Sequence, residues 1–562
     1  MKFKKVICSL LLSAVMLGTL VGCGNTSEEM SQPDADGASG AAASGEEAAG
    51  GEASDIVPEE LTLPLTEEKQ ELSVWVVYSD QEKPDPNEMI CVQKLEELTN
   101  VHVNWITVGA EEAKDKFGIM INSGDYPDII CSIDLNYPGG IEKGIEDGVF
   151  LDMDEICRKY MPNYMASLES NEEARREASS DSGRLLAPKI LLGKEKTVEA
   201  SGTQRGLVYR QDILESLGMD VPVTVEEWHQ VLLKCKENGM MSPMSLSSSG
   251  ASELSLAWGV NTVAPPTYFQ LDGSKVVFGP SLDGYGEYLE TMRQWREEGL
   301  ISSNFTSGNL LETMDFATMQ NDEVMLMSNW AFWSGDTMCT MGIVTNPDFY
   351  LQAIQNPVLE EGAEVIQCTQ DNITNGTMYV TTGCKDPVLA AKWLDFMYSE
   401  EGALLNHYGI EGETYTIDEN GLPQYTEAVF EHEGAKNASG YLKNYCLAGG
   451  RVYLGKEDST ATIKITDTLS KDGLNNQQVA SDIWSVPKNI ALPGGIQLTS
   501  EEGSKLNTQL TSLNTLIEEY TVNYILGTDN RSFEEFRSQL YDYGLQECID
   551  IYQAAYDRYL QR

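Results

Sequence analysis

The sequence predicts an exported α/β protein whose folded part is divided into two or more lobes. Apolar stretches at 72–78 and 101–108 flank a segment with helical apolar spacing, which indicates a β-α-β unit with parallel strands. A second series of strand-like and helix-like stretches begins at Gly206. The folded part spans roughly 500 residues, whereas single hydrophobic cores stop growing at about 250–300 residues, so we expect more than one core.

The amino-terminal region has the form of a bacterial export signal. A start with three lysines precedes an apolar run over 6–21, which is short for a membrane-spanning helix and ends in the letters LVGC at Cys23. Small residues before a cysteine match a lipobox, in which the cysteine sulfur receives a diacylglyceryl group before cleavage. We therefore expect residues 1–22 to be a lipoprotein signal peptide and Cys23 to be the lipid attachment site. An ordinary signal peptide with an incidental cysteine is the alternative.

Residues 23–60 are expected to form a tether, because they are rich in Gly, Ala, Ser and acidic side chains and hold few apolar ones. No later stretch approaches the length of a membrane span. The chain carries 88 acidic and 38 basic side chains, for a formal net charge of −50. Such a surface repels phosphate backbones, which argues against a nucleic-acid partner and, unless a local basic pocket exists, against a polyanionic ligand.

The cysteines and histidines argue against metal centres. Nine cysteines beyond Cys23 are scattered without a CxxC pair, so neither a zinc site nor a disulfide framework is indicated, although one or two bridges stay open. The four histidines are far apart and none lies in a metal-binding motif. We expect no cofactor.

The sequence also holds no clear enzyme motif. Neither a GxSxG nucleophile elbow nor a phosphate-binding P-loop occurs. Carboxylate pairs could serve as acid and base of a glycosidase, but in a chain with 88 acidic residues their presence decides nothing. We expect a protein that is not an enzyme, with a cell-surface glycosidase or lyase as the alternative.

Further elements follow from turn and capping signals. The turn-forming stretch 123–127 precedes a third strand at 128–131, and capping boxes open helices at Thr224 and Ser532. Trp75, Trp393 and the aromatic stripes of the closing helices are expected to lie in the core. Other strands and helices are predicted at 207–209, 211–217, 325–327, 376–381 and 387–398.

Four stretches of the chain carry a family resemblance. They are SGDYPDII at 123–130, the stretch 207–228, HYGIEGE at 407–413 and AAYDRY at 554–559. In this order, behind a lipobox, they resemble the family 1 extracellular solute-binding proteins of ABC importers, particularly the long lipoprotein branch of Gram-positive bacteria. The resemblance implies an α/β, two-lobed periplasmic-binding-protein-like fold of type II, with hinged lobes, a ligand cleft and extra C-terminal helices.

The resemblance further implies lobes that are discontinuous in sequence. We expect the N-lobe in 61–200 with a return segment at 351–410, and the C-lobe in 201–350 completed by 411–562 with its helical extension. The implied protein is a monomer, lipid-anchored on the extracellular face of the cell membrane of a Gram-positive-type bacterium. It would deliver its solute to an ABC permease.

One stretch departs from the family pattern. Many long relatives carry an acidic calcium loop after the helix that corresponds to the one opening at Thr224. Here the corresponding residues 234–243 read KCKENGMMSP, with one carboxylate and one amide. Calcium takes about six to eight oxygen ligands, so we expect this loop to bind no calcium, and we expect no other metal.

Candidate ligand-binding residues follow the predicted strands, at whose carboxyl ends open α/β sheets place ligands. Flat aromatic rings hold sugar faces, and polar groups hold hydroxyls. A tryptophan-rich cleft therefore favours a sugar, and an oligosaccharide over a monosaccharide. The alternatives are a peptide or another polar solute, and ligand sensing without transport. The candidates are Trp330, Trp333 and Trp258 on one lobe, and Asp134, Tyr137, Ser79 and Asp80 on the other.

Overall fold

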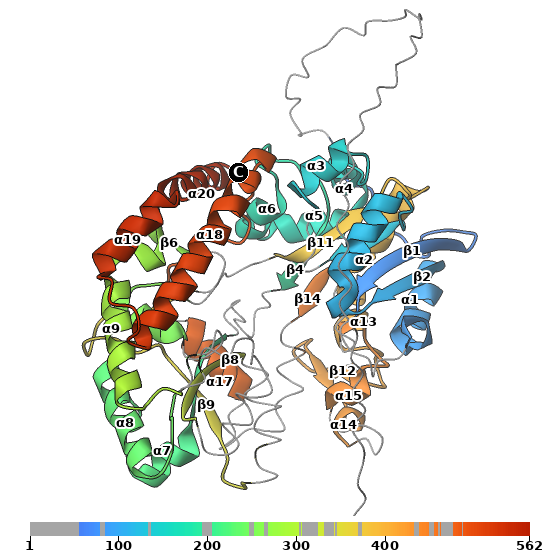
Figure 1. Ribbon diagram of the computed structural model, residues 1–562. Coiled ribbons are helices and arrows are strands. Elements are labelled where there is room, and N and C mark those ends of the chain that lie inside the picture. The colour runs from blue at the N-terminus through green and yellow to red at the C-terminus, as the bar shows by residue number, and fades with distance from the viewer. Residues whose placement is uncertain are drawn as a thin grey trace, which may run out of the picture. The chain divides into compact units, whose positions relative to one another are not determined.

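The computed structural model divides the chain into two units, Met1–Asp55 and Ile56–Arg562, and all described residues belong to the second (Figure 1). The structure describes residues 56–78, 85–132, 137–193, 205–244, 246, 252–262, 268–302, 305, 324–330, 342, 346–368, 374–431, 438–448, 454–458, 461, 476–485 and 487–562. The predicted signal peptide, Cys23 and most of the predicted tether lie outside these ranges. Within them, no helix combines the length and the apolar content that a membrane crossing requires.

The sheet of the first lobe consists of β1 (Gln70–Val77), β2 (Val101–Val108), β3 (Ile129–Ser132), β4 (Lys189–Gly193), β11 (Thr374–Val380) and β14 (Lys456–Asp458). In the described part of the chain, the strand order is β14-β4-β11-β3-β1-β2. β1 pairs in parallel with β2 and β3, whereas β11 runs antiparallel to β3 and β4. The predicted β-α-β unit is confirmed, because α1 (Ile90–Thr99) connects the parallel neighbours β1 and β2.

The other helices of the first lobe are α2 (Ala110–Ser123), α3 (Gly140–Glu146), α4 (Asp154–Tyr160), α5 (Pro162–Glu169), α6 (Glu172–Ala178), α12 (Pro387–Phe396) and α13 (Glu400–His407). Side chains of β1 alternate between two cores, with Leu72 and Val74 in one and Trp75 in the other. Trp75 is 3% exposed and Trp393 is 0% exposed, which confirms that both tryptophans belong to the core.

The sheet of the second lobe consists of β5 (Arg205–Arg210), β8 (Leu326–Trp330) and β9 (Leu351–Ile354), in the order β8-β5-β9 with antiparallel pairing. The lobe also holds α7 (Gln211–Leu217), α8 (Val225–Glu237), α9 (Asp283–Glu297), α17 (Asn476–Ser485), α18 (Ser500–Ile525), α19 (Phe533–Asp542), α20 (Leu545–Tyr559), and the hairpin of β6 (Phe269–Asp272) and β7 (Lys275–Phe278). Leu513 of α18, Phe536 of α19 and Tyr559 of α20 join the same buried core as Trp228 of α8. The predicted helical end of the chain therefore packs on the second lobe.

Several helices begin at the predicted caps. Capping boxes at Thr224 and Ser532 start α8 and α19, and each uses a glutamate three residues later. A further capping box at Thr499 starts α18 and was not predicted. Each cap satisfies backbone N–H groups that the first helical turn leaves unpaired, which contributes about 1 kcal/mol of stability.

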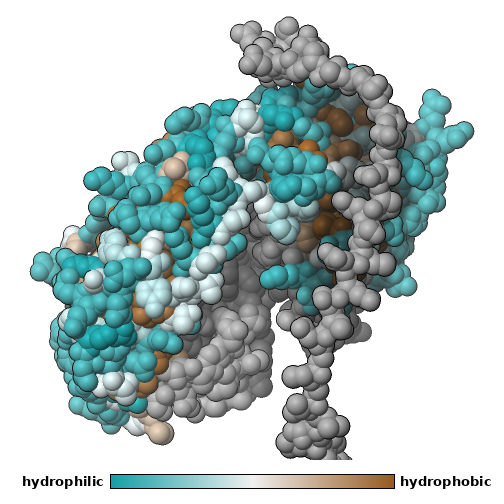
Figure 2. All heavy atoms as spheres, turned by 45° about the horizontal axis from the view of Figure 1, so that its top comes forward, coloured by the Kyte–Doolittle hydropathy of each residue, from teal (hydrophilic) through white to brown (hydrophobic). Residues whose placement is uncertain are grey.

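Smaller elements complete the described part. They are η2 (Pro86–Glu88), η3 (Ser252–Trp258), η4 (Gly279–Ser281), β10 (Ile366–Gln367), β12 (Tyr415–Ile417), β13 (Pro423–Tyr425), α14 (Glu427–Phe430), α15 (Ala438–Leu442) and β15 (Lys488–Asn489). β12 pairs with β13, and β10 with β15. The face of the molecule in Figure 2 is mainly hydrophilic where residues are described, as the acidic composition leads one to expect.

The chain passes between the two sheets through stretches outside the described ranges. Residues 194–204 join β4 to β5, residues 369–373 precede β11, and residues 459–475 separate β14 from α17, which packs on β9. β9 pairs with β5 of the second sheet, and β14 pairs with β4 of the first. We propose that the chain changes lobe within these stretches. The strands β14, β4 and β11 are neighbours in the first sheet.

Candidate ligand-binding site

The pairing of β1 and β3 defines one edge of the predicted site. The two strands are parallel, and Val76 of β1 is paired with Cys131 of β3. Because the strands are parallel, β1 and β3 end at the same carboxyl edge of the sheet, and Ser79 and Asp134 follow the paired residues by three positions in the sequence. Ser79, Asp80 and Asp134 themselves lie outside the described residues.

The second acidic residue of the SGDYPDII stretch, Asp128, has a structural role in this edge. Asp128 Oδ2 accepts hydrogen bonds from the Ser73 backbone N–H at 2.7 Å and from Ser73 Oγ at 2.6 Å. The Asp128 backbone N–H donates in return to Ser73 Oγ at 2.9 Å. These reciprocal bonds fix the start of β3 against β1.

Tyr137 is the described candidate on the first lobe. Its ring lies edge-on to Phe150, with 5.6 Å between centroids, and its hydroxyl donates to Asp147 Oδ2 at 2.9 Å. Burial, together with the neighbouring Asp147 carboxylate, raises the pKa of the Tyr137 hydroxyl. The side chain is half-buried, so its ring and hydroxyl are held in one orientation by neighbours from the same segment.

Trp330 is the last residue of β8, and its backbone pairs with Arg205, the first residue of β5. Residues 194–204 immediately precede Arg205, so Trp330 lies at the end of the second sheet where the chain arrives from the first lobe. Trp333 lies outside the described residues. The position of Trp330 suits a residue that meets a ligand between lobes, and its binding role stays a prediction.

Trp258 ends η3 and is partly buried against the core of the second lobe. Its ring lies edge-on to Tyr288 at 5.5 Å between centroids. A Cβ atom at Gly284 would come within 2.3 Å of the Trp258 carbonyl oxygen, so only glycine permits α9 to approach this closely. These contacts anchor Trp258 in the lobe, and its contact with a ligand stays a prediction.

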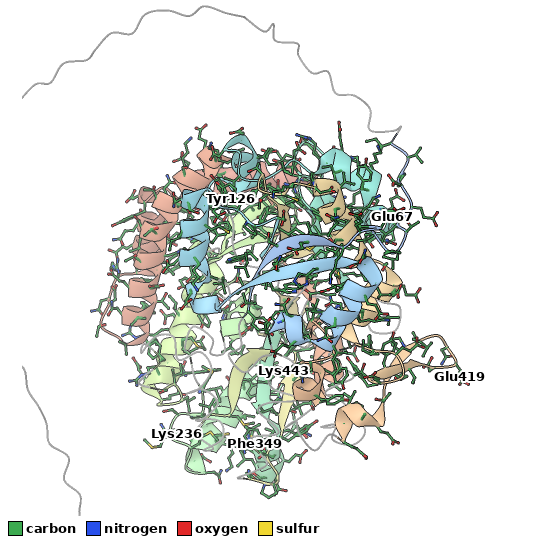
Figure 3. The ribbon with its side chains drawn as sticks, turned by 90° about the vertical axis from the view of Figure 1, so that its right-hand side faces the viewer. Glu67, Tyr126, Lys236, Phe349, Glu419 and Lys443 are labelled. Atoms are coloured by element: carbon green, nitrogen blue, oxygen red, sulfur yellow. The ribbon has the colours of Figure 1, made fainter. Side chains whose placement is uncertain are left out.

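The stretch 207–228 contains a charged pair whose role the sequence did not reveal. Arg210 is fully buried and donates from Nε and Nη2 to the two carboxylate oxygens of Asp212, at 2.8 and 2.6 Å. Its guanidinium lies 4.2 Å from the centre of the Phe349 ring, which is labelled in Figure 3. Asp212 also accepts from the Tyr350 backbone N–H at 3.3 Å. The pair therefore joins β5 and α7 to the segment before β9.

Two further buried charged groups lie where the connections leave the first sheet. Lys189 of β4 donates to Thr377 Oγ1 at 2.7 Å, and burial lowers the pKa of its ammonium group to about 8. Glu177 of α6 is 2% exposed and accepts from the backbone N–H and the hydroxyl of Thr374, both at 3.0 Å. Lys189 precedes three apolar residues, which hints at burial. Nothing local distinguishes Glu177 from the other acidic residues of this chain.

The polar side chains of the stretch 234–243 contact neighbouring protein groups. Glu237 pairs with Lys234 at 3.1 Å, and the Asn238 amide donates to the Lys234 carbonyl oxygen at 2.8 Å. Lys236, labelled in Figure 3, donates to the carbonyl oxygen of Glu298 after α9. Among the described residues, no group of three or more His, Cys, Asp or Glu side chains is arranged to hold a metal ion.

Comparison with known proteins identifies relatives of this chain. It matches the family described as bacterial extracellular solute-binding protein over residues 87–404. It is 24% identical to the fructooligosaccharide ABC transporter substrate-binding protein FusA of Streptococcus pneumoniae over 584 residues, which cover 100% of this chain and 99% of the relative. Lipoprotein LipO of Bacillus subtilis is 22% identical over 380 residues, or 61% of this chain and 68% of the relative.

Solved structures show the same architecture. FusA in complex with kestose gives a TM-score of 0.67 at 20% identity, covering 87% of this chain and 99% of that one. An extracellular solute-binding protein from Bifidobacterium longum subsp. infantis gives a TM-score of 0.69 at 17% identity, covering 87% and 98%.

Two lobes, each with its own sheet, define a two-lobed solute-binding protein of the type II periplasmic-binding-protein-like fold. The family match spans more than half of the chain. This chain therefore belongs to the bacterial extracellular solute-binding protein family, which confirms the resemblance read from the sequence. FusA is a substrate-binding protein by name.

Proposed function

We propose that this chain is the lipid-anchored receptor of an ABC importer, which captures an oligosaccharide between its lobes and delivers it to a membrane permease. The observation that carries this proposal is the similarity to FusA along both whole chains, because it includes both lobes and the C-terminal helices together. The name of FusA specifies a fructooligosaccharide, which makes short fructans the first ligands to test.

The proposed ligand site combines the two sheet ends described above. Aromatic rings of the second lobe would stack on sugar faces, and polar groups of the first lobe would bind hydroxyls. A ligand that contacts both lobes favours the closed form by its differential affinity for that form. The proposed binding residues are Trp330, Trp333, Trp258, Asp134, Tyr137, Ser79 and Asp80.

The proposal also places the protein in the cell. Cys23 would carry the lipid that holds the chain on the extracellular face of the membrane, and residues 23–60 would act as the tether. The similarity to LipO, a lipoprotein by name, supports this anchoring. We propose a monomeric protein without catalytic activity, because the named relatives bind substrate and the sequence holds no nucleophile or metal motif.

The function is tested by a thermal-shift screen of the soluble chain 24–562 against fructans, other oligosaccharides and peptides. A ligand that binds only the folded state stabilises it by RT ln(1 + [L]/Kd), about 2.7 kcal/mol at a hundredfold excess over Kd. We expect a clear shift with one glycan class and recovery of that glycan intact. Cleaved glycan would support an enzyme instead, and a shift with peptides alone would overturn the proposed ligand class.

Transport and anchoring are tested in cells of the source bacterium. Deletion of the gene is expected to abolish uptake of the labelled glycan identified by the screen. Loss of transcriptional response with intact uptake would instead indicate a sensor. Fatty-acid labelling is expected to mark the wild-type protein but not the variant Cys23→Ala, and equal labelling of both would refute the lipid anchor.

A further inference from the structure

Two arginines near the end of α20 converge on one carboxylate of the other lobe. Arg558 Nε donates to Asp181 Oδ2 at 2.7 Å, and Arg562 donates to Asp181 Oδ1 from Nε at 2.9 Å and from Nη2 at 2.6 Å. Asp181 follows α6 of the first lobe. Its two oxygens are thus shared between two guanidinium groups of the second lobe.

The contacts of Arg562 extend this junction. Its Nη1 donates to the Ser179 carbonyl oxygen at 3.0 Å and to the Gly495 carbonyl oxygen at 2.7 Å, and its side chain is 0% exposed. Burying a guanidinium is costly unless every donor is directed at an acceptor. Here the acceptors come from both lobes, so the arginine is satisfied only while α6, the segment before α18, and α20 stay together.

Glu502 of α18 fixes the second arginine. Arg558 donates to its two carboxylate oxygens at 2.9 and 2.7 Å. Burial alone would raise the pKa of Glu502, but the bonds from Arg558 and Thr499 outweigh it and lower the pKa. Asp181, Arg558, Arg562 and Glu502, called the arginine clamp below, therefore carry two positive and two negative charges in one hydrogen-bonded set.

The arginine clamp joins two separate hydrophobic cores. Ala174 and Ala178 of α6 pack in the core of the first lobe, whereas Tyr556 and Tyr559 of α20 pack in the core of the second. A Cβ atom at Gly495 would come within 2.8 Å of Glu177 Cγ and 3.0 Å of the Tyr559 ring. The backbone therefore passes tightly between the lobes next to the clamp.

The clamp also lies beside the start of β11. Glu177, in the last turn of α6, accepts from both the backbone N–H and the hydroxyl of Thr374. Thr374 is the first residue of β11, directly after the connection 369–373. One short segment of the first lobe, 177–181, thus binds Arg558 and Arg562 and also the first residue of β11.

From this arrangement we infer that the arginine clamp is a fixed pivot, which sets the balance between open and closed forms without touching the ligand. This inference rests on the proposed capture between lobes. Arg562 and Asp181 are positioning residues in this account: their loss changes how far the lobes separate, and ligand affinity follows from that change.

The inference is tested with Arg562→Ala in the soluble chain 24–562. The matched control is Arg537→Ala, because Arg537 also pairs with two carboxylates, Asp283 and Glu534, but all three belong to the second lobe. Circular dichroism first establishes that each variant is folded. Without ligand, we expect Arg562→Ala to change the scattering radius and to speed amide exchange at 374–377, while Arg537→Ala changes neither.

Ligand affinity supplies a second measurement. A change in the open–closed balance is expected to weaken binding by roughly threefold to thirtyfold in Arg562→Ala and not in the control. Folded Arg562→Ala with wild-type scattering and exchange would overturn the inference. If that variant does not fold, Arg562→Lys and Asp181→Asn carry the same test. Scattering and exchange use no ligand, so failure of the proposed ligand class would change only the affinity measurement.

Discussion

Replacing Asp395 tests how strongly one buried carboxylate holds the first lobe together. Asp395 of α12 is 0% exposed and accepts from the Tyr164 backbone N–H at 2.9 Å and from the Asn163 side-chain amide at 2.8 Å. It also accepts from the Asn163 backbone N–H at 3.3 Å. These backbone donors belong to the first turn of α5, so a residue of one helix caps another helix more than two hundred positions away.

The magnitude follows from these bonds. Hydrogen bonds to a charged group contribute about 1.5–3 kcal/mol each, and a buried donor left unpaired costs about 1–3 kcal/mol. Recovering the desolvation cost of the carboxylate offsets part of this loss. We expect Asp395→Ala to lower the free energy of unfolding by about 3 kcal/mol. Asp395→Asn keeps one acceptor oxygen, so we expect a loss of about 1–2 kcal/mol.

The pH dependence has a definite sign. Burial raises the pKa of Asp395 from 3.8 to about 6, against the opposing bonds from Tyr164 and Asn163. The folded protein therefore takes up a proton at this site before the unfolded chain does. The stability that this raised pKa contributes is fully present below pH 3.8 and is lost as the pH rises through 6. The stability difference between wild type and Asp395→Asn should thus grow by about 1 kcal/mol from pH 7.5 to pH 5.

The assay is urea unfolding of the soluble chain, followed by circular dichroism at both pH values. The control is Asp115→Asn on the exposed face of α2, which should change stability by less than about 0.5 kcal/mol at pH 7.5. A loss below about 1 kcal/mol for Asp395→Ala would refute the capping argument. A stability difference that shrinks on acidification would refute the raised pKa.

Four further predictions follow. Trp330→Ala should weaken binding of the identified glycan by at least about 2 kcal/mol in calorimetry, and unchanged affinity removes Trp330 from the site. Adding calcium or a chelator should leave the melting temperature unchanged, because 234–243 holds so few oxygen ligands; a calcium-dependent rise contradicts this. Wild type should gain stability between about pH 8 and 10, because Lys189 loses its proton at a lower pH in the folded chain than in the unfolded chain. Lys189→Met should abolish this gain in urea unfolding; a gain that persists in the variant would mean that another group causes it. Gly206→Ala should cost about 1–3 kcal/mol in denaturant unfolding, because its Cβ would lie 2.4 Å from the Trp484 ring, and a neutral effect would mean that α17 shifts freely.

Much of the fold could be predicted because its signals are local. β1 and β2 are rich in apolar and β-branched residues, and the apolar spacing between them is helical, so the β-α-β unit needed no long-range information. The capping boxes at Thr224 and Ser532 mark helix starts within four residues. β14 carried no such signal, because it has three residues, Lys456–Asp458, and joins the sheet only through β4. The expected lobe boundaries therefore stay a prediction.

The polar contacts near the junction of the lobes were harder to predict, because they join residues that are far apart in the sequence. Lys189 donates a hydrogen bond to Thr377, 188 positions away, and Asp181 accepts one from Arg558, 377 positions away. A chain with 88 acidic side chains offers no compositional reason to single out Asp181 or Glu177. Strand ends, by contrast, are visible in the sequence, which is why the predicted candidates gather there.

The chemistry of the junction between the lobes fits a protein whose lobes must separate and return. An apolar junction would be stabilised in proportion to its buried area. Because hydrophobic contact is not directional, several relative positions of the two lobes could bury a similar area. Hydrogen bonds from Arg558 and Arg562 to Asp181 require one geometry, since a guanidinium fork matches carboxylate oxygens in a plane. Such a junction contributes little net stability but defines one position of α20 relative to α6. A receptor with open and closed forms a few kcal/mol apart needs that combination, because a small ligand can shift only a small difference.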